Sequence, residues 1–454
     1  MDTRALLEKQ KEYFASGATL PYEFRARQLK KFADALNAWE DRLTAALWED
    51  LKKSETEAVM TETGLVRAEL SHAIRHLKRW MRTRRVKTPL AQFPSKSRVF
   101  PQPLGVSLIV APWNYPVQLS LCPLIGAIAA GCCACVKLSA NAPHTADAIS
   151  QMLRETFDEN HVAPITGSHA QHENLTAQKF DFIFFTGSGA AGRDVLQKAA
   201  ANLTPVLLEL GGKSPVLIDE SANIPLAAKR TAFGKCLNAG QTCVAPDYVL
   251  LPKTKKDEFI SEYRKAVAEF YPNGDFEQYP AIVNARHFER LQNLMKTSNL
   301  VFGGECDEAS RRIVPAVACP VSWDEPLMCE EIFGPILPGL TYENWDDAIR
   351  TLQSRDRPLA LYVFSESRAH VRDAHARLRF GGGCVNDTIV HLSTNALPFG
   401  GVGESGMGHY HGRASFDAFS HECSVLQKST RLDLPMRYAP YTEKKLRLIR
   451  MFLK

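Results

Sequence analysis

Residues 180–210 read FDFIFFTGSGAAGRDVLQKAAANLTPVLLEL, and this stretch decides the fold class. The apolar run at 180–186 predicts a buried strand, residues 190–201 predict a helix, and the run at 205–210 predicts a second strand. The same alternation occurs elsewhere in the chain, with strand-like runs at 106–111 and 133–138 and a helical segment at 257–270. Short apolar strands separated by helices indicate parallel sheets with crossover connections, so the sequence predicts an α/β protein.

The turn between the first strand and the helix is rich in glycine. It reads Gly187-Ser188-Gly189-Ala190-Ala191-Gly192, and the helix is expected to begin near Arg193. In nucleotide-binding turns of this G-x-G-x-x-G form, glycines let the backbone approach a pyrophosphate and the helix N-terminus offers free N–H groups. Glu209 lies 17 positions after Gly192, near the usual place of the ribose-binding acid. The pattern favours dinucleotide binding, and an ordinary glycine-rich turn is the alternative.

Composition excludes several other classes of protein. The chain has 454 residues, of which 45% are hydrophobic and 23% charged, as in an ordinary globular protein. The formal net charge of +5 implies no nucleic-acid partner by itself. The N-terminus lacks the apolar region of a secretory signal, and five prolines interrupt the uncharged stretch 99–136, so no integral membrane segment is expected. Eleven cysteines in so long a chain indicate free thiols in a reducing compartment, and we expect a cytoplasmic protein.

The regions before and after the α/β part are also patterned. Residues 21–80 are predicted to be helical, with an apolar stripe formed by Leu29, Phe32, Leu36, Trp39, Leu43 and Leu47. Basic residues cluster from Arg75 to Lys87, which we interpret as the end of a helix that continues into an extended arm. The tail at 444–454 predicts a short basic amphipathic helix, expected to pack on a partner subunit or fray rather than bind a membrane surface.

Cys243 is the candidate nucleophile among the eleven cysteines. It lies in NAGQTCV, residues 238–244, where small and polar neighbours do not have the pattern of a helix or strand core. The other ten are interpreted as packing thiols. Cys132, Cys133 and Cys135 lie in an apolar run whose spacing does not fit a zinc site, and no metal site is expected.

Five motifs, in order along the chain, resemble the aldehyde dehydrogenase superfamily, and the third and fifth are most similar to class 3 enzymes. They are APWNYP (111–116), ELGGKSP (209–215), NAGQTCVAPDYVL (238–250), EEIFGP (330–335) and PFGGVGESGMG (398–408). The resemblance covers roughly residues 5–440. It implies two Rossmann-like α/β domains with a small β oligomerisation arm, and NAD(P)⁺-dependent oxidation of medium-chain aliphatic or aromatic aldehydes to carboxylates.

The resemblance also implies the catalytic roles. Cys243 would attack the aldehyde to form a thiohemiacetal, whose oxyanion would be bound by the Asn114 amide and the Cys243 backbone N–H. After hydride transfer, the thioacyl-enzyme would be hydrolysed by water that Glu209 activates. The glycine-rich pattern would instead place Glu209 on a ribose; we favour the role as base, because GGKSP follows it directly.

Cofactor-binding residues follow from the same resemblance. Lys137 would contact the adenosine ribose, Glu331 would hold the nicotinamide ribose with Phe333 beside it, and Trp113 and Gly187–Gly192 would lie on the pyrophosphate and adenine side. The chain departs from the usual K-P-S-E motif, since it reads Lys137-Leu-Ser-Ala140. The missing glutamate would bind a 2′-hydroxyl and repel a 2′-phosphate, so we expect NADP⁺ to be accepted comparably with NAD⁺.

The expected domain organisation also comes from the family. Residues 1–80 and 101–208 would form the NAD(P)-binding domain, 209–395 the catalytic domain, and 81–100 with 421–440 the oligomerisation arm of a homodimer. Three alternatives stay open: a relative that transfers the acyl group to phosphate or coenzyme A, a cysteine hydrolase, and a catalytically inactive homologue. Glu209 disfavours the first, the absence of histidine near Cys243 in the sequence disfavours the second, and the complete residue set disfavours the third.

Overall fold

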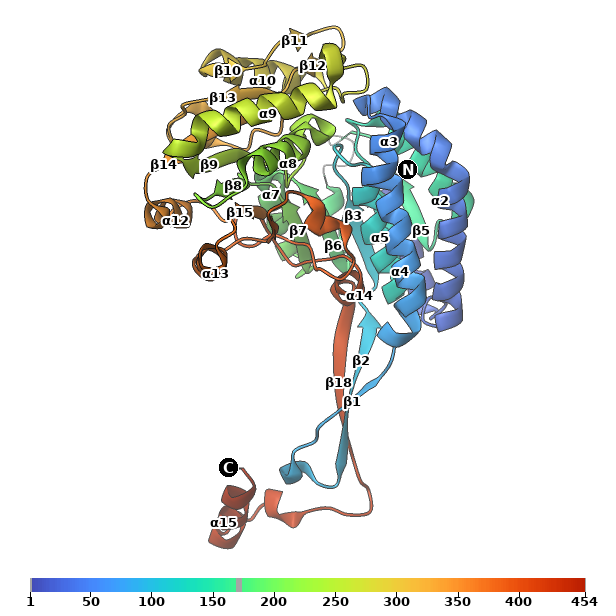
Figure 1. Ribbon diagram of the computed structural model, residues 1–454. Helices are drawn as coiled ribbons and strands as arrows, with labels where there is room; N and C mark the ends of the chain where they lie inside the picture. The colour runs from blue at the N-terminus through green and yellow to red at the C-terminus, as the bar shows by residue number, and fades with distance from the viewer. Residues whose placement is uncertain (1, 169–173, 454) are drawn as a thin grey trace.

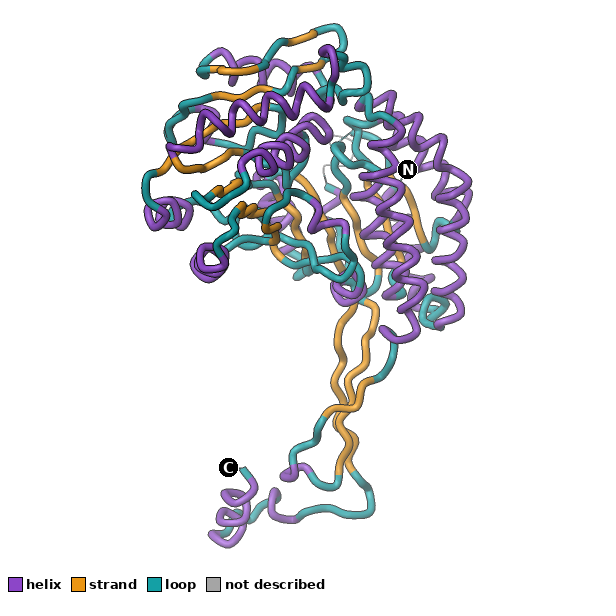
Figure 2. The backbone as a smooth tube through the Cα atoms, viewed as in Figure 1, coloured by secondary structure: helices purple, strands orange, loops and turns teal. Residues whose placement is uncertain are grey.

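Two mostly parallel β-sheets and a projecting three-stranded arm make up the computed structural model, which describes residues 2–168 and 174–453 (Figure 1). The strands of the arm run away from the strands of the two larger sheets (Figure 2). The α/β fold class predicted from the alternating strands and helices is confirmed.

The first sheet has the strand order β17-β7-β6-β3-β4-β5, and all its strands are parallel except β17, which runs antiparallel to β7. The bounds are β3 (Val106–Val110), β4 (Cys133–Lys137), β5 (Val162–Ile165), β6 (Phe182–Gly187), β7 (Val206–Leu210) and β17 (Gly406–Met407). Crossover helices α5 (Gln118–Ala130), α6 (Pro143–Thr156) and α7 (Gly189–Ala200) connect neighbouring strands. The carboxyl ends of β3, β4, β6 and β7 therefore meet at one edge of the sheet.

Both faces of this sheet are covered, which explains its nearly continuous apolar strands. One face packs on the helices that cover the sheet in Figure 1, namely α2 (Tyr22–Leu51), α4 (Gly64–Trp80), α5 and α6. The other face packs on α1 (Thr3–Ala15) and α7. The predicted stripe from Leu29 to Leu47 is buried against the first face. Between α2 and α4 lie the short helix α3 (Glu55–Ala58) and a π-helical turn, η1 (Val59–Thr63).

The second sheet has the order β10-β13-β14-β9-β8-β15-β16, and only β10 at its edge is antiparallel. Its strands are β8 (Pro215–Ile218), β9 (Tyr248–Pro252), β10 (Leu300–Phe302), β13 (Ala316–Ala318), β14 (Ile336–Tyr342), β15 (Ala360–Phe364) and β16 (Gly382–Val385). Its helices are α8 (Ile224–Cys236), α9 (Lys256–Phe270), α10 (Ala285–Lys296), α11 (Pro326–Cys329), α12 (Trp345–Gln353) and α13 (Arg368–Arg377), with a small hairpin of β11 (Cys306–Asp307) and β12 (Arg312–Ile313). The short helix α14 (Arg413–Ala418) returns to pack on α5.

The arm is an antiparallel sheet of β1 (Arg84–Val86), β2 (Ser95–Pro103) and β18 (Ser420–Lys428), and the C-terminal helix α15 (Glu443–Phe452) lies at its far end (Figure 1). The basic cluster spans the end of α4 and β1, as predicted. Helix α15 confirms the tail helix over its described part, and Lys454 lies outside the described residues. Within the described part of the chain, no helix is both long and apolar enough to cross a membrane.

Two expectations from the sequence are wrong in detail. Helix α7 begins at Gly189 rather than near Arg193, because the Ser188 hydroxyl accepts a hydrogen bond from the Ala191 N–H and so caps the helix early. The packing interpretation of ten thiols fails for Cys306 and Cys329, which are exposed. Cys306 lies in the short strand β11 and Cys329 ends the short helix α11, where a cysteine side chain can face solvent and needs no packing role.

Candidate active site

The loops that carry the predicted nucleophile and the predicted oxyanion donor are joined by hydrogen bonds. Asn114 lies in the loop after β3 and is 3% exposed, and its Nδ2 donates to the Gln241 carbonyl oxygen at 3.0 Å. A second link joins the same two loops, since the Tyr115 and Thr242 hydroxyls are 2.6 Å apart. Cys243 follows directly. The bond to Gln241 uses one of the two amide hydrogens of Asn114, which leaves the other for an oxyanion.

The loop before Cys243 has an unusual backbone. Asn238, Ala239 and Gly240 all have positive φ, at 51°, 52° and 71°. Gly240 is required there, because a Cβ would lie 2.3 Å from the Gly334 carbonyl oxygen. Such conformations cost of order 1–3 kcal/mol per non-glycine residue and persist only when surrounding contacts fix them.

The Gln241 side chain supplies part of that fixation. It is fully buried, and its Nε2 donates to the carbonyl oxygens of Asn238 and Ala281 while its Oε1 accepts from the Val283 N–H. These bonds attach the loop to the segment before α10. The sequence motifs do not single out these supporting residues; the Asn-x-x-Gln spacing just before the candidate cysteine is the one local signal for them.

Two carboxyl groups lie near Cys243, that of the buried Glu209 and that of the partly exposed Glu331. Glu209, at the end of β7, is 2% exposed, and neither carboxyl oxygen has a hydrogen-bond partner among the described residues. Burial raises its pKa well above the usual value for a glutamate. Burial raises the pKa of Glu331 to about 8, with further repulsion from Asp247. Burial, Glu331 and Glu209 together raise the pKa of the Cys243 thiol, so the surroundings favour the protonated forms of both the thiol and Glu209.

An apolar pocket with about 760 Å³ of open space reaches Cys243. Its lining is largely aliphatic and aromatic and includes Met60, Leu65, Leu119, Phe233, Leu237, Ile389, Val390, Leu392, Phe399 and Tyr410. Such a lining suits an apolar ligand that presents one polar group to the nucleophile. His411 also lines the pocket, and burial lowers its pKa to about 4, so its imidazole is neutral.

A second, polar pocket of about 1140 Å³ is lined in part by Glu331, whose charge also acts on Cys243. Ser188, Gly189, Gly211 and Gly212 line it together with Glu331, and it begins at the N-terminus of α7. A Cβ on Gly211 would lie 1.9 Å from Glu331 Oε2, so only glycine allows this carboxyl group to lie against the turn. A glycine-lined cradle at a helix N-terminus fits a dinucleotide phosphate, and a carboxyl beside it fits ribose hydroxyls.

The remaining cofactor candidates fall into two groups. Trp113 packs edge-on against Phe333 with ring centroids 5.4 Å apart, so these two lie together near Glu331. Lys137, at the end of β4, donates from Nζ to the carbonyl oxygens of Leu138 at 2.7 Å and Gly167 at 2.8 Å. Gly187 ends the nearby strand β6. No cluster of three or more metal-ligating side chains occurs within the residues that the structure describes.

Comparison with known proteins decides the family. The model of the aldehyde dehydrogenase family matches residues 1–425 of this chain. The chain belongs to this family.

Several relatives of this aldehyde dehydrogenase cover nearly its whole length. It is 46% identical to 4,4′-diaponeurosporen-aldehyde dehydrogenase of Staphylococcus aureus, over 98% of this chain and 97% of the relative. It is 40% identical to aldehyde dehydrogenase family 3 member B1 of Rattus norvegicus, over 98% and 96%. A solved structure described as the substrate-bound state of Staphylococcus aureus AldH matches with a TM-score of 0.97 and 45% identity, over all of both chains. An NAD-dependent aldehyde dehydrogenase of Sinorhizobium meliloti matches with a TM-score of 0.87 and 25% identity, over 95% and 88%.

These matches confirm the class 3 resemblance and the fold. The protein is an oxidoreductase that oxidises aldehydes, and it uses an NAD(P) cofactor. The roles of individual residues and the domain bounds expected from the sequence stay predictions.

Proposed function

We propose that this aldehyde dehydrogenase oxidises medium-chain aliphatic or aromatic aldehydes to carboxylates through a thioacyl intermediate on Cys243. The observation that carries the proposal is the position of Cys243: it lines an apolar pocket, and the polar, glycine-lined pocket next to Glu331 lies close by. An aldehyde in the first pocket and a dinucleotide in the second would meet at this residue.

Cys243 Sγ forms a bond to the aldehyde carbon as its proton leaves to solvent, and the carbonyl oxygen becomes an oxyanion. Asn114 Nδ2 and the Cys243 N–H donate to that oxygen, and one such donor is typically worth about 3 kcal/mol in the transition state. When bound, the nicotinamide supplies the two-electron acceptor for the hydride that leaves this carbon. Glu209, once deprotonated, takes a proton from water as that water attacks the thioester, and the carboxylate and the Cys243 thiol are released.

Two features support an apolar substrate. The pocket around Cys243 contains aliphatic and aromatic side chains from distant parts of the chain, including Leu119, Phe233, Leu392 and Phe399. A relative that is 46% identical is named for 4,4′-diaponeurosporen-aldehyde. Desolvation of an apolar chain contributes about 0.8 kcal/mol per buried methylene, so affinity should rise with chain length until the pocket is full.

The cofactor cradle supports use of both NAD⁺ and NADP⁺. Ala140 stands where the family motif has a glutamate, so the position near Lys137 has no carboxylate to repel a 2′-phosphate. We include dual cofactor use in the proposal.

The arm supports a homodimer. It extends away from the body that holds the two α/β sheets, and exposed apolar residues such as Val425 and Leu426 lie on β18 (Figure 1). We also include a cytoplasmic location, because all eleven cysteines are free thiols. Light scattering on the purified protein tests the dimer.

The test of the proposed function is an absorbance assay at 340 nm with straight-chain aldehydes of increasing length, an aromatic aldehyde and 4,4′-diaponeurosporen-aldehyde, each with NAD⁺ and with NADP⁺. We expect kcat/KM to rise with apolar chain length and to differ less than about tenfold between cofactors. A preference for small polar aldehydes would contradict the proposed substrate class, and a preference for NAD⁺ above about a hundredfold would contradict dual cofactor use.

A further inference from the structure

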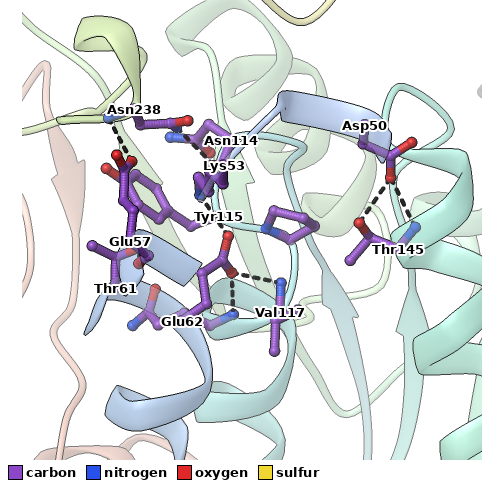
Figure 3. Close-up of polar contacts among 12 residues, drawn as sticks. Asp50, Lys53, Glu57, Thr61, Glu62, Asn114, Tyr115, Val117, Thr145 and Asn238 are labelled. Atoms are coloured by element: carbon purple, nitrogen blue, oxygen red, sulfur yellow. Dashed lines mark hydrogen bonds and ion pairs between the residues drawn. The ribbon is translucent and has the colours of Figure 1, made fainter. Parts of the chain in front are cut away.

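A buried charged cluster lies directly behind the predicted oxyanion site (Figure 3). It consists of the buried Lys53 and Glu62 and the partly exposed Glu57, all from the segment that joins α2 to α4. None of these three residues has a role in the chemistry proposed above. Lys53 and Glu62 are both 0% exposed, which is rare for charged side chains unless they are paired.

Lys53 and Glu62 form a fully buried ion pair. Lys53 Nζ lies 2.6 Å from Glu62 Oε1 and 3.9 Å above the Tyr115 ring centroid. The second oxygen of Glu62 accepts the backbone N–H groups of Val117 and Gln118, both at 2.9 Å, where helix α5 begins. The carboxylate therefore holds the end of the loop that carries Asn114.

Lys53 also holds Asn114 itself. Its Nζ donates to the Asn114 carbonyl oxygen at 2.9 Å, and the Asn238 side chain donates to the same oxygen at 2.8 Å. That carbonyl thus accepts from one cation on the helical side and from one amide on the loop that carries Cys243. A backbone atom held from two directions leaves the Asn114 side chain few alternative positions.

Glu57 holds Asn238, the second donor to the Asn114 carbonyl oxygen. Its Oε1 accepts the Asn238 backbone N–H at 2.8 Å, at the first of the three residues with positive φ. Ion pair, Asn114 and strained loop therefore form one continuous hydrogen-bonded network (Figure 3). A network of this kind fixes a geometry that the loop backbone alone would not keep.

We propose that Lys53 and Glu62 are positioning residues for the reaction: through the Asn114 backbone they set the side-chain amide that receives the oxyanion. The inference rests on the proposed function, because it assumes that Asn114 stabilises that oxyanion. Neither residue is expected to touch the aldehyde or the cofactor. Their effect should appear in kcat and should depend on the presence of the Asn114 amide.

A double-mutant cycle tests this dependence. The first change is the double substitution Lys53→Met and Glu62→Gln, which removes both members of the ion pair together, so that neither is left as an unpaired buried ion. The second change is Asn114→Ala. We expect the charge removal to lower kcat roughly tenfold to a hundredfold in the wild-type background, as small misplacements of a catalytic group do. In the Asn114→Ala background the same change should lower kcat less than about threefold, and the KM for aldehyde should stay within about twofold.

Asp50 provides a matched control. It is a buried carboxylate one residue before the end of α2, and its Oδ2 accepts the Thr145 N–H at 2.8 Å at the start of α6, much as Glu62 does at α5 (Figure 3). It does not contact Asn114. Asp50→Asn should lower the melting temperature and leave kcat within about twofold of wild type.

The outcomes separate the two ideas. A wild-type protein without NAD(P)⁺-dependent aldehyde oxidation would refute the proposed function and this inference with it. An active wild type whose kcat loss from charge removal is equally large with and without the Asn114 amide would refute only the positioning role. If the charge-removed protein does not fold, Lys53→Met alone, which leaves Glu62 with the Val117 and Gln118 N–H groups as donors, takes its place in the same cycle with the same two criteria.

Discussion

Glu209→Gln separates the two half-reactions of the proposed chemistry. Glu209 is 2% exposed, and its carboxyl oxygens make no hydrogen bond among the described residues, so a glutamine of the same shape breaks no contact. Burial raises its pKa and so favours the neutral acid, which the amide resembles closely. We therefore expect the variant to fold normally and to bind cofactor as wild type does.

The magnitude follows from the task of the base. A positioned general base typically contributes 10²–10⁴ in rate, which corresponds to about 3–5 kcal/mol of barrier at about 1.4 kcal/mol per tenfold. Only hydrolysis of the thioester needs this base, because Asn114 and the backbone N–H of Cys243 remain for the first half-reaction. The variant should therefore release about one NADH per active site in a fast phase and then turn over 10²–10⁴ times more slowly.

Rapid mixing with detection at 340 nm measures both phases, and cofactor titration measures binding. Glu69→Gln is a suitable control, because Glu69 is also a buried carboxyl with a raised pKa, about 7, but it accepts a hydrogen bond from the Gly412 N–H. That variant should keep steady-state turnover. Loss of the fast phase together with loss of cofactor affinity in Glu209→Gln would show that Glu209 binds the ribose, the role we disfavoured.

Three further predictions concern cofactor, pH and substrate. Ala140→Glu should lower kcat/KM for NADP⁺ at least about tenfold while NAD⁺ changes less than about threefold, because a carboxylate repels a 2′-phosphate; equal losses with both cofactors would contradict this reading of the motif. The pKa values of Cys243 and Glu209 are both raised, and both groups must lose a proton to act. We therefore expect kcat, measured with an aliphatic aldehyde, to increase as the pH rises from about 7 to 9. A flat or falling pH profile would count against the roles assigned to these two residues. Leu392→Asp places a charge in the apolar pocket and should lower kcat/KM for octanal about tenfold. The effect on acetaldehyde should be much smaller, because only the longer aldehyde desolvates that charge. Equal effects on the two aldehydes would show that the substrate binds elsewhere.

The sheets were the most predictable part of the molecule. Strands β3, β4, β6 and β7 coincide within two residues with the apolar runs of the sequence, because strands buried on both faces need apolar residues throughout. The stripe from Leu29 to Leu47 was equally clear, since a helix with one buried face repeats every three to four residues. Both signals are local and periodic, so they can be detected in the sequence without knowing which residues are neighbours in the folded structure.

Helix ends and surface thiols were less predictable because they depend on single contacts. The start of α7 is set by one side-chain hydrogen bond from the Ala191 N–H to Ser188, and the glycines around it gave no indication of which residue would begin the helix. The exposure of Cys306 and Cys329 depends on which short strands and loops reach the surface. Composition alone assigns cysteine to the interior on average, and an average does not place an individual residue.

The support of the candidate site was beyond any local pattern. Lys53 is 61 positions from Asn114 in the sequence, and Asn238 is 124 positions from it, yet all three meet at one carbonyl oxygen. A lysine next to a helix end normally indicates a solvated surface, so nothing near Lys53 in the sequence distinguishes it from its partly exposed neighbour Lys52. The burial of Lys53 depends on its contacts with Glu62 and with the ring of Tyr115. Tyr115 belongs to a different part of the chain, so the sequence around Lys53 does not show this contact. Motifs identify the groups that react, because chemistry constrains the type and spacing of those residues. The residues that hold the reacting groups in place are constrained only by the fold. The double-mutant cycle on Lys53, Glu62 and Asn114 measures how much of the rate depends on such positioning residues.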